Sequence, residues 1–87
     1  MTAPDTEGLV RRFLAEQVLG EAEVGRIGRD DHLLKMGVLN SLTLTHLIVF
    51  LEEQLGIRVL PAEFDPQNFQ SIRAICEYVA RKAPGGP

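Results

Sequence analysis

The residue most suited to take part in a reaction is Ser41, because the surrounding sequence places its hydroxyl at the start of a helix. Asn40 is a strong helix N-cap, since its side-chain oxygen can accept a hydrogen bond from a free backbone N–H. Gly37, shortly before, suits a backbone position with positive φ. Helix N-termini attract phosphate through their free N–H groups and the helix dipole. A phosphodiester on Ser41 would therefore lie in a favourable field.

Three other groups could be read as reactive, and each has a simpler interpretation. Cys76 lies on the apolar stripe of the last predicted helix, which indicates a buried and inert thiol. His46 stands five residues after Ser41, so the two side chains point in different directions and His46 cannot readily take the serine proton. Residues 30–32, Asp-Asp-His, have no second histidine nearby, which favours a cap or turn over a metal site. We predict no catalytic residue and no metal ligand.

Length and composition place the chain among small globular domains. With 87 residues, 45% of them hydrophobic, it suits a single domain near the small end of what folds unaided. One cysteine excludes an internal disulfide and fits a reducing compartment, so we expect a cytoplasmic protein. The start does not resemble a signal peptide, and no apolar run reaches transmembrane length. A mildly acidic stretch after Ser41 argues against nucleic acid, so we expect neither nucleic acid nor membrane as a partner.

The spacing of apolar residues predicts an all-α fold, a small four-helix bundle with three longer helices and a short third one. The helices are expected at about 6–19, 41–55, 66–69 and 71–82, with a long loop at 21–40 between the first two. Residues 5–82 form the domain, between a disordered start at 1–4 and a disordered tail at 83–87.

The long loop has too many apolar residues for a free linker, so we expect it to lie on the bundle and to present Ser41. Its candidate anchors are Val24, Ile27, Leu33, Leu34, Met36 and Leu39.

The predicted helix at 41–55 has two different faces. Its apolar stripe comprises Leu44, Leu47, Ile48, Leu51 and Leu55, with Phe50 beside it. Because each such side chain contributes roughly 1.5–3 kcal/mol when buried, this helix should supply most of the core. Leu42 and Val49 lie off the stripe, and apolar residues exposed near Ser41 would suit contact with a partner protein.

These residues carry a family resemblance. Residues 37–42, Gly-Val-Leu-Asn-Ser-Leu, look like the glycine-x-x-aspartate-serine-leucine signature of acyl carrier proteins. Residues 51–57 resemble the end of that family's second helix, and residues 66–72 resemble its short third helix and the start of the fourth. The resemblance extends over nearly the whole chain, from Leu9 to Lys82.

The resemblance implies a carrier that holds an acyl or aminoacyl intermediate as a thioester on a 4′-phosphopantetheine arm, attached covalently to Ser41. A phosphopantetheinyl transferase would attach the arm. Acyl-loading and acyl-processing enzymes, such as ligases, acyltransferases or ketosynthases, would then dock in turn. It implies a monomer without catalysis of its own, in polyketide, fatty acid or related natural-product biosynthesis. The residues expected to dock partners are Asn40, Leu42, His46, Val49 and Glu53.

The chain departs from the family pattern in two places. Asn40 stands where the family usually has aspartate, which keeps the cap but drops a charge worth roughly 0.3–1 kcal/mol to the helix dipole. In the family, that aspartate also meets the modifying enzyme. No acidic residue occurs from Leu42 to Leu51, and His46 stands where a glutamate is common. Electrostatic docking to basic partner surfaces is therefore expected to be weaker, or to use another part of the protein. This suggests a dedicated stand-alone carrier in a specialised pathway.

Two alternatives remain open from the sequence. The first is a helical interaction module that keeps the carrier fold but is never modified, and Asn40 is the residue that favours it. The second is a small hydrolase, which requires that Ser41 react with an active-site serine probe in the isolated protein.

Overall fold

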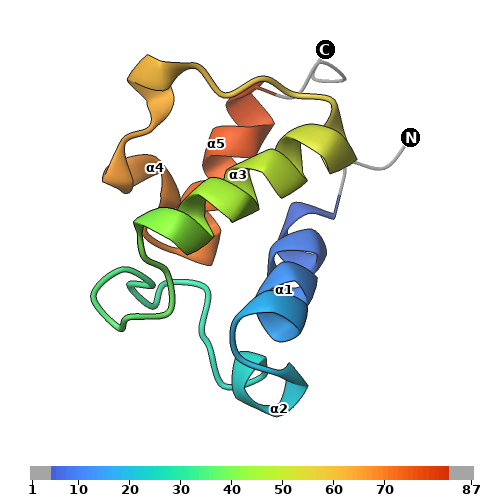
Figure 1. Ribbon diagram of the computed structural model, residues 1–87, viewed down its shortest axis with the longest axis vertical. Helices are drawn as coiled ribbons and strands as arrows, with labels where there is room; N and C mark the ends of the chain where they lie inside the picture. The colour runs from blue at the N-terminus through green and yellow to red at the C-terminus, as the bar shows by residue number, and fades with distance from the viewer. Residues whose placement is uncertain (1–4, 83–87) are drawn as a thin grey trace.

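The computed structural model describes residues 5–82, which form five α-helices and one 3₁₀ turn without any β-strand in that range (Figure 1). In chain order the segments are α1 (Thr6–Gln17), α2 (Glu21–Val24), α3 (Ser41–Leu55), the 3₁₀ turn η1 (Pro61–Glu63), α4 (Pro66–Phe69) and α5 (Ile72–Lys82). The predicted all-α class, with three longer helices and a short one before the last, is therefore confirmed. The predictions for residues 1–4 and 83–87 lie outside the described residues.

The main difference from the expected elements is α2, a single helical turn inside the stretch that the sequence predicted as a loop. Its backbone is closed by bonds from Val24 N to Gly20 O and from Gly25 N to Glu21 O, at 3.1 and 3.2 Å. The first helix is also shorter than predicted, because α1 ends at Gln17. The last helix starts at Ile72, one residue later than predicted.

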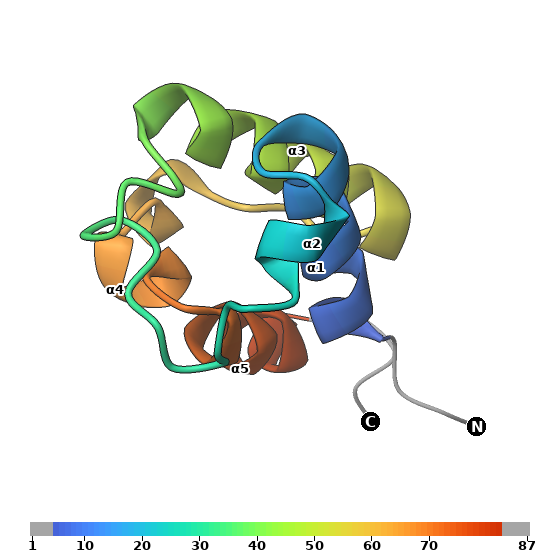
Figure 2. The same cartoon turned by 90° about the horizontal axis from the view of Figure 1, so that it is seen from below.

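The helices surround one common centre (Figure 2). The buried side chains form a single core cluster there. Leu47 and Leu51 of α3 are completely buried, and Phe50 is half-buried with its ring centroid 5.5 Å from that of Phe13. These contacts agree with the apolar stripe that the sequence predicted on this helix. Other residues with the lowest exposure in the core are Val10, Leu14, Leu33, Phe69, Ile72 and Ile75.

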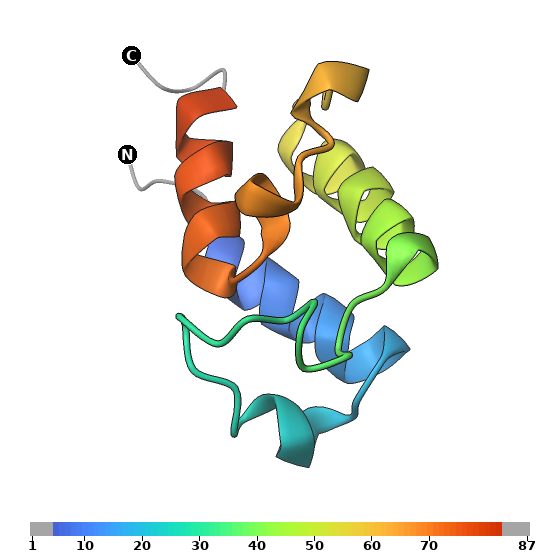
Figure 3. The ribbon, with the colours of Figure 1, turned by 90° about the vertical axis from the view of Figure 1, so that its left-hand side faces the viewer.

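The loop between α2 and α3 lies against the bundle, between the N-terminal ends of α5 and α3 (Figure 3). Leu33 N donates to Gln70 O at 2.7 Å, and Arg73 N donates to Arg29 O at 2.9 Å. The buried anchors are Val24, Ile27, Leu33, Val38 and Leu39, with Leu34 partly buried. Met36, one of the candidate anchors, is 53% exposed instead and lies in the turn at residues 33–37.

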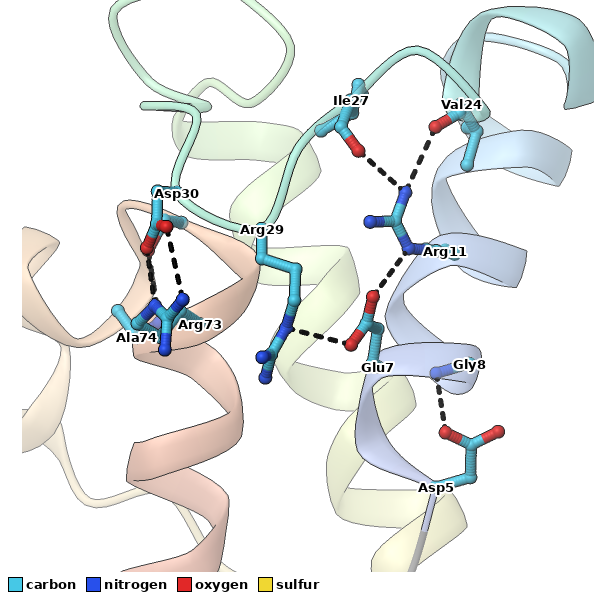
Figure 4. Close-up of polar contacts among 11 residues, drawn as sticks. Asp5, Glu7, Gly8, Arg11, Val24, Ile27, Arg29, Asp30, Arg73 and Ala74 are labelled. Atoms are coloured by element: carbon cyan, nitrogen blue, oxygen red, sulfur yellow. Dashed lines mark hydrogen bonds and ion pairs between the residues drawn. The ribbon is translucent and has the colours of Figure 1, made fainter.

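Hydrogen bonds and ion pairs of charged side chains join α2 and the same loop to α1 and α5 (Figure 4). Arg11 donates to Val24 O at 3.1 Å and to Ile27 O at 2.8 Å, while its Nε pairs with Glu7 at 3.0 Å. Glu7 also pairs with Arg29 at 3.0 Å, and Arg73 donates to both carboxylate oxygens of Asp30.

None of the helices within residues 5–82 combines the length and the apolar character needed to span a membrane.

Candidate functional site

Ser41 is the first residue of α3 and is exposed to solvent. The preceding residue, Asn40, has the extended backbone typical of an N-cap, with φ −130° and ψ −174°. Its Oδ1 accepts hydrogen bonds from Leu42 N at 2.9 Å and from Thr43 N at 3.0 Å. In return, Thr43 Oγ1 accepts from Asn40 N at 2.8 Å. This reciprocal capping box fixes the direction in which α3 begins, and therefore where the Ser41 hydroxyl lies.

The chain just before the cap is held by a compact turn. Gly37 has φ +77°, as the sequence predicted, which a residue with a Cβ rarely adopts. Val38 N and Leu39 N both donate to Leu33 O, at 2.9 and 3.2 Å, and both side chains are buried. Because Leu33 N is bonded to Gln70 O, the turn that carries Ser41 is tied to the junction of α4 and α5.

The surroundings of Ser41 fit a phosphodiester. The first turn of α3 has no acidic residue, and its cap is a neutral amide. The helix of 15 residues has its positive end at this point, so an anion on the serine oxygen is favoured by the dipole and repelled by no neighbouring carboxylate in the turn.

Comparison with known proteins bears on this arrangement. A sequence profile of the family described as "Phosphopantetheine attachment site" matches residues 12–79, well over half of the chain. The chain belongs to this family. It is a phosphopantetheine carrier protein, and the prosthetic group of the family is 4′-phosphopantetheine. Carrier proteins of this family are generally not catalytic. A sequence comparison with curated proteins gives no match.

In this carrier protein, the residues predicted to dock partners share one side of α3. Leu42, His46, Val49 and Glu53 are all exposed, and we call them the outer stripe. At 3.6 residues per turn they lie within about 60° of arc, opposite the buried residues of the same helix. Asn40 is exposed at the N-cap of α3 and directly precedes Ser41. The structure therefore brings four of the five predicted residues to one side of α3, and the fifth, Asn40, is the cap of that helix.

Other polar side chains of α3 and of the loop before it make local hydrogen bonds. Thr45 Oγ1 donates to Ser41 O at 2.8 Å, which is a bond within the first turns of the helix. Asp31 Oδ2 accepts from Gly28 N at 2.8 Å, and His32 Nδ1 accepts from Lys35 N at 3.2 Å. Within residues 5–82, no group of three or more metal-ligating side chains is close enough to hold a metal ion.

Cys76 is half-buried at the edge of the core, whereas the sequence predicted a buried thiol. Burial raises the pKa of this thiol, and the nearby Arg29 opposes that shift. A thiol with a raised pKa is a poor nucleophile at neutral pH, because the thiolate is the reactive form.

The structure clarifies the roles of two residues near the site. Thr43 completes the capping box, a role that a hydroxyl three residues after the cap indicates. Met36 lies exposed in the turn before Asn40, and an apolar side chain in a loop does not reveal by itself whether it anchors the loop or faces solvent.

Proposed function

We propose that Ser41 is the residue that carries the 4′-phosphopantetheine arm. The observation that supports this most is the exposed hydroxyl at the first position of α3, beside a neutral cap and within the matched family region. The Ser41 oxygen attacks the phosphorus of coenzyme A on the pantetheine side and forms a serine phosphodiester. Adenosine 3′,5′-bisphosphate leaves, and the serine proton passes to a base of the transferase.

The loaded carrier then presents its bound group to partner enzymes. The arm supplies a thiol that holds an acyl or aminoacyl group as a thioester. The residues of the chain keep the attachment point at the end of a rigid helix, and the capping box keeps that end from fraying. The proposed docking residues are Asn40 and the outer stripe, which contact the transferase and then the loading and processing enzymes.

The proposal extends to a pathway and a setting. The neutral first turns of α3 favour a dedicated carrier in polyketide, fatty acid or related natural-product biosynthesis, acting as a cytoplasmic monomer. The single cysteine of the chain fits the reducing cytoplasm.

The test is intact mass after incubation with coenzyme A and a broad-specificity phosphopantetheinyl transferase. One phosphopantetheine addition is expected for the wild type and for Ser71→Ala, and none for Ser41→Ala. Ser71 is a suitable control because it is the only other serine of the chain, and it is buried with its Oγ accepting from Ala74 N.

The competing function is the interaction module that is never modified, which Asn40 favours. If several transferases leave both the wild type and Asn40→Asp unmodified, the carrier proposal is wrong for this serine and the interaction module takes its place. A phosphopantetheine mass addition to Ser41→Ala would show that the arm is attached to another residue.

A further inference from the structure

The side-chain amide of Asn40 is oriented by the cap that it forms. Its Oδ1 accepts from the backbone N–H groups of Leu42 and Thr43, at 2.9 and 3.0 Å. Because both partners are donors, the atom that faces them must be the oxygen, which fixes the two ends of the amide. The amide is planar, so its Nδ2 group is turned away from these two N–H groups. It lies on an exposed residue that directly precedes Ser41.

Most hydrogen-bond donors at the start of α3 are already used. Thr43 Oγ1 accepts from Asn40 N at 2.8 Å, and Asn40 O accepts from Leu44 N at 2.8 Å. Two donors there make no hydrogen bond within residues 5–82, namely the Nδ2 group of Asn40 and the backbone N–H of Ser41. The backbone N–H is present whatever side chain stands at position 40, so only the Nδ2 group is specific to this sequence.

We propose that the Asn40 side chain donates a hydrogen bond from Nδ2 to the phosphodiester on Ser41, so that attachment of the arm stabilises the start of α3. This inference rests on the proposed function and gives Asn40 a role in the modified protein. The non-bridging oxygens of a phosphodiester share a negative charge, and hydrogen bonds to an ionised acceptor are about twice as strong as those between neutral groups. An aspartate at this position has no donor and would repel the phosphodiester. Asn40 is therefore a positioning residue for the base of the arm.

The first measurement is NMR of the ¹⁵N-labelled protein, before and after a phosphopantetheinyl transferase has attached the arm. On modification, one proton of the Asn40 Nδ2 group should move downfield, as expected when it donates to an ionised oxygen. Asn68 is the internal control, because it is the only other asparagine of the chain and its Nδ2 already donates to Glu63 O at 3.0 Å. The Nδ2 signals of Asn68 should not move.

Thermal unfolding then measures what this contact contributes to stability. For each protein the shift of Tm on modification is determined, so that the effect of a substitution on the cap itself cancels. The wild type should gain about 4 °C more than Asn40→Gly, because glycine is accepted at N-caps but has no side-chain donor. Asn40→Asp keeps the capping oxygen, but its Tm should fall on modification, because carboxylate and phosphodiester repel. If Asn40 served the cap alone, the shift would be the same in the wild type and in Asn40→Gly.

Two results would overturn the inference once intact mass shows one phosphopantetheine on Ser41. One is an Asn40 Nδ2 signal that does not move, and the other is an equal Tm shift in the wild type and Asn40→Gly. Both leave the proposed function intact. If no transferase adds the arm, the attachment proposal fails instead, and Ser41→phosphoserine, introduced during translation, places a phosphate on the same oxygen. A downfield shift of the Asn40 signal in that protein supports the contact, and its absence rejects the contact.

Discussion

Asn40 combines a structural role with the most informative departure from the family signature. Its Oδ1 satisfies two backbone N–H groups at the start of α3, those of Leu42 and Thr43. An aspartate would make the same two bonds and would add a negative charge at the positive end of the helix. The choice of amide over carboxylate therefore leaves the cap unchanged and makes the field around Ser41 more favourable to an anion.

Substitutions of Asn40 separate the contribution of the capping hydrogen bonds from that of the charge at the start of α3. Asn40→Ala removes the cap and should lower the free energy of unfolding by about 1 kcal/mol. Asn40→Asp should raise it by about 0.3–1 kcal/mol in the unmodified protein, because the carboxylate favours the helix dipole. Urea unfolding followed by circular dichroism measures both. If the arm is on Ser41, the gain from Asn40→Asp should shrink in the modified protein, since carboxylate and phosphodiester repel. Equal stability of Asn40→Ala and the wild type would contradict the capping role.

At the scale of elements, η1 is connected to α5 through one carboxylate. Glu63 Oε1 accepts from Leu60 N at 3.0 Å, from Lys82 Nζ at 2.9 Å and from Tyr78 Oη at 3.1 Å. The bond from Leu60 and the contact with Lys82 hold the pKa of Glu63 below its usual range. Burial, followed by the hydrogen bond to Glu63, raises the pKa of Tyr78 to about 12. The ionised carboxylate and the protonated phenol are thus the forms that the fold favours.

This connection predicts how stability depends on pH. The folded state lowers the pKa of Glu63, so its contribution is complete above the unfolded value, about 4.3, and is lost as pH falls through the folded value. Glu63→Gln should therefore flatten the acid limb of a plot of melting temperature against pH. Glu16→Gln makes the same charge change on the exposed side of α1 and should leave that limb as in the wild type. An unchanged acid limb in Glu63→Gln would show that the carboxylate does not stabilise the fold.

Sequence patterns predicted the longer helices well, because their apolar spacing and caps are local signals. The range of α4, Pro66–Phe69, agrees with the predicted 66–69, because Asp65 caps the helix and Pro66 suits its first position. The single turn α2 was missed, since four residues between two glycines show no period. Tyr78 was also missed as a core residue, and its bond to Glu63 spans 15 positions, which no local pattern reveals.

For the whole molecule, the position of Ser41 depends on contacts between segments that are distant in sequence. The loop before α3 is bonded to α1 through Arg11 and to α5 through Arg73 (Figure 4). The sequence predicted that this loop would lie on the bundle, from its apolar residues. It could not predict the guanidinium of Arg11 beside two backbone carbonyls, because that contact exists only once α1 and the loop have folded together.

Arg11→Met tests this arrangement, because it keeps the aliphatic packing but leaves the carbonyls of Val24 and Ile27 without their donor. We expect local destabilisation of about 1 kcal/mol, so that amide hydrogen exchange at Leu33 and Arg73 becomes about fivefold faster. Arg12→Met is the matched control: it removes the same charge from an exposed position, where the guanidinium stacks over Phe50. If amide exchange in the loop becomes faster by the same factor in both variants, the lost charge rather than the Arg11 hydrogen bonds accounts for the effect. If neither changes, its apolar anchors alone suffice to position Ser41.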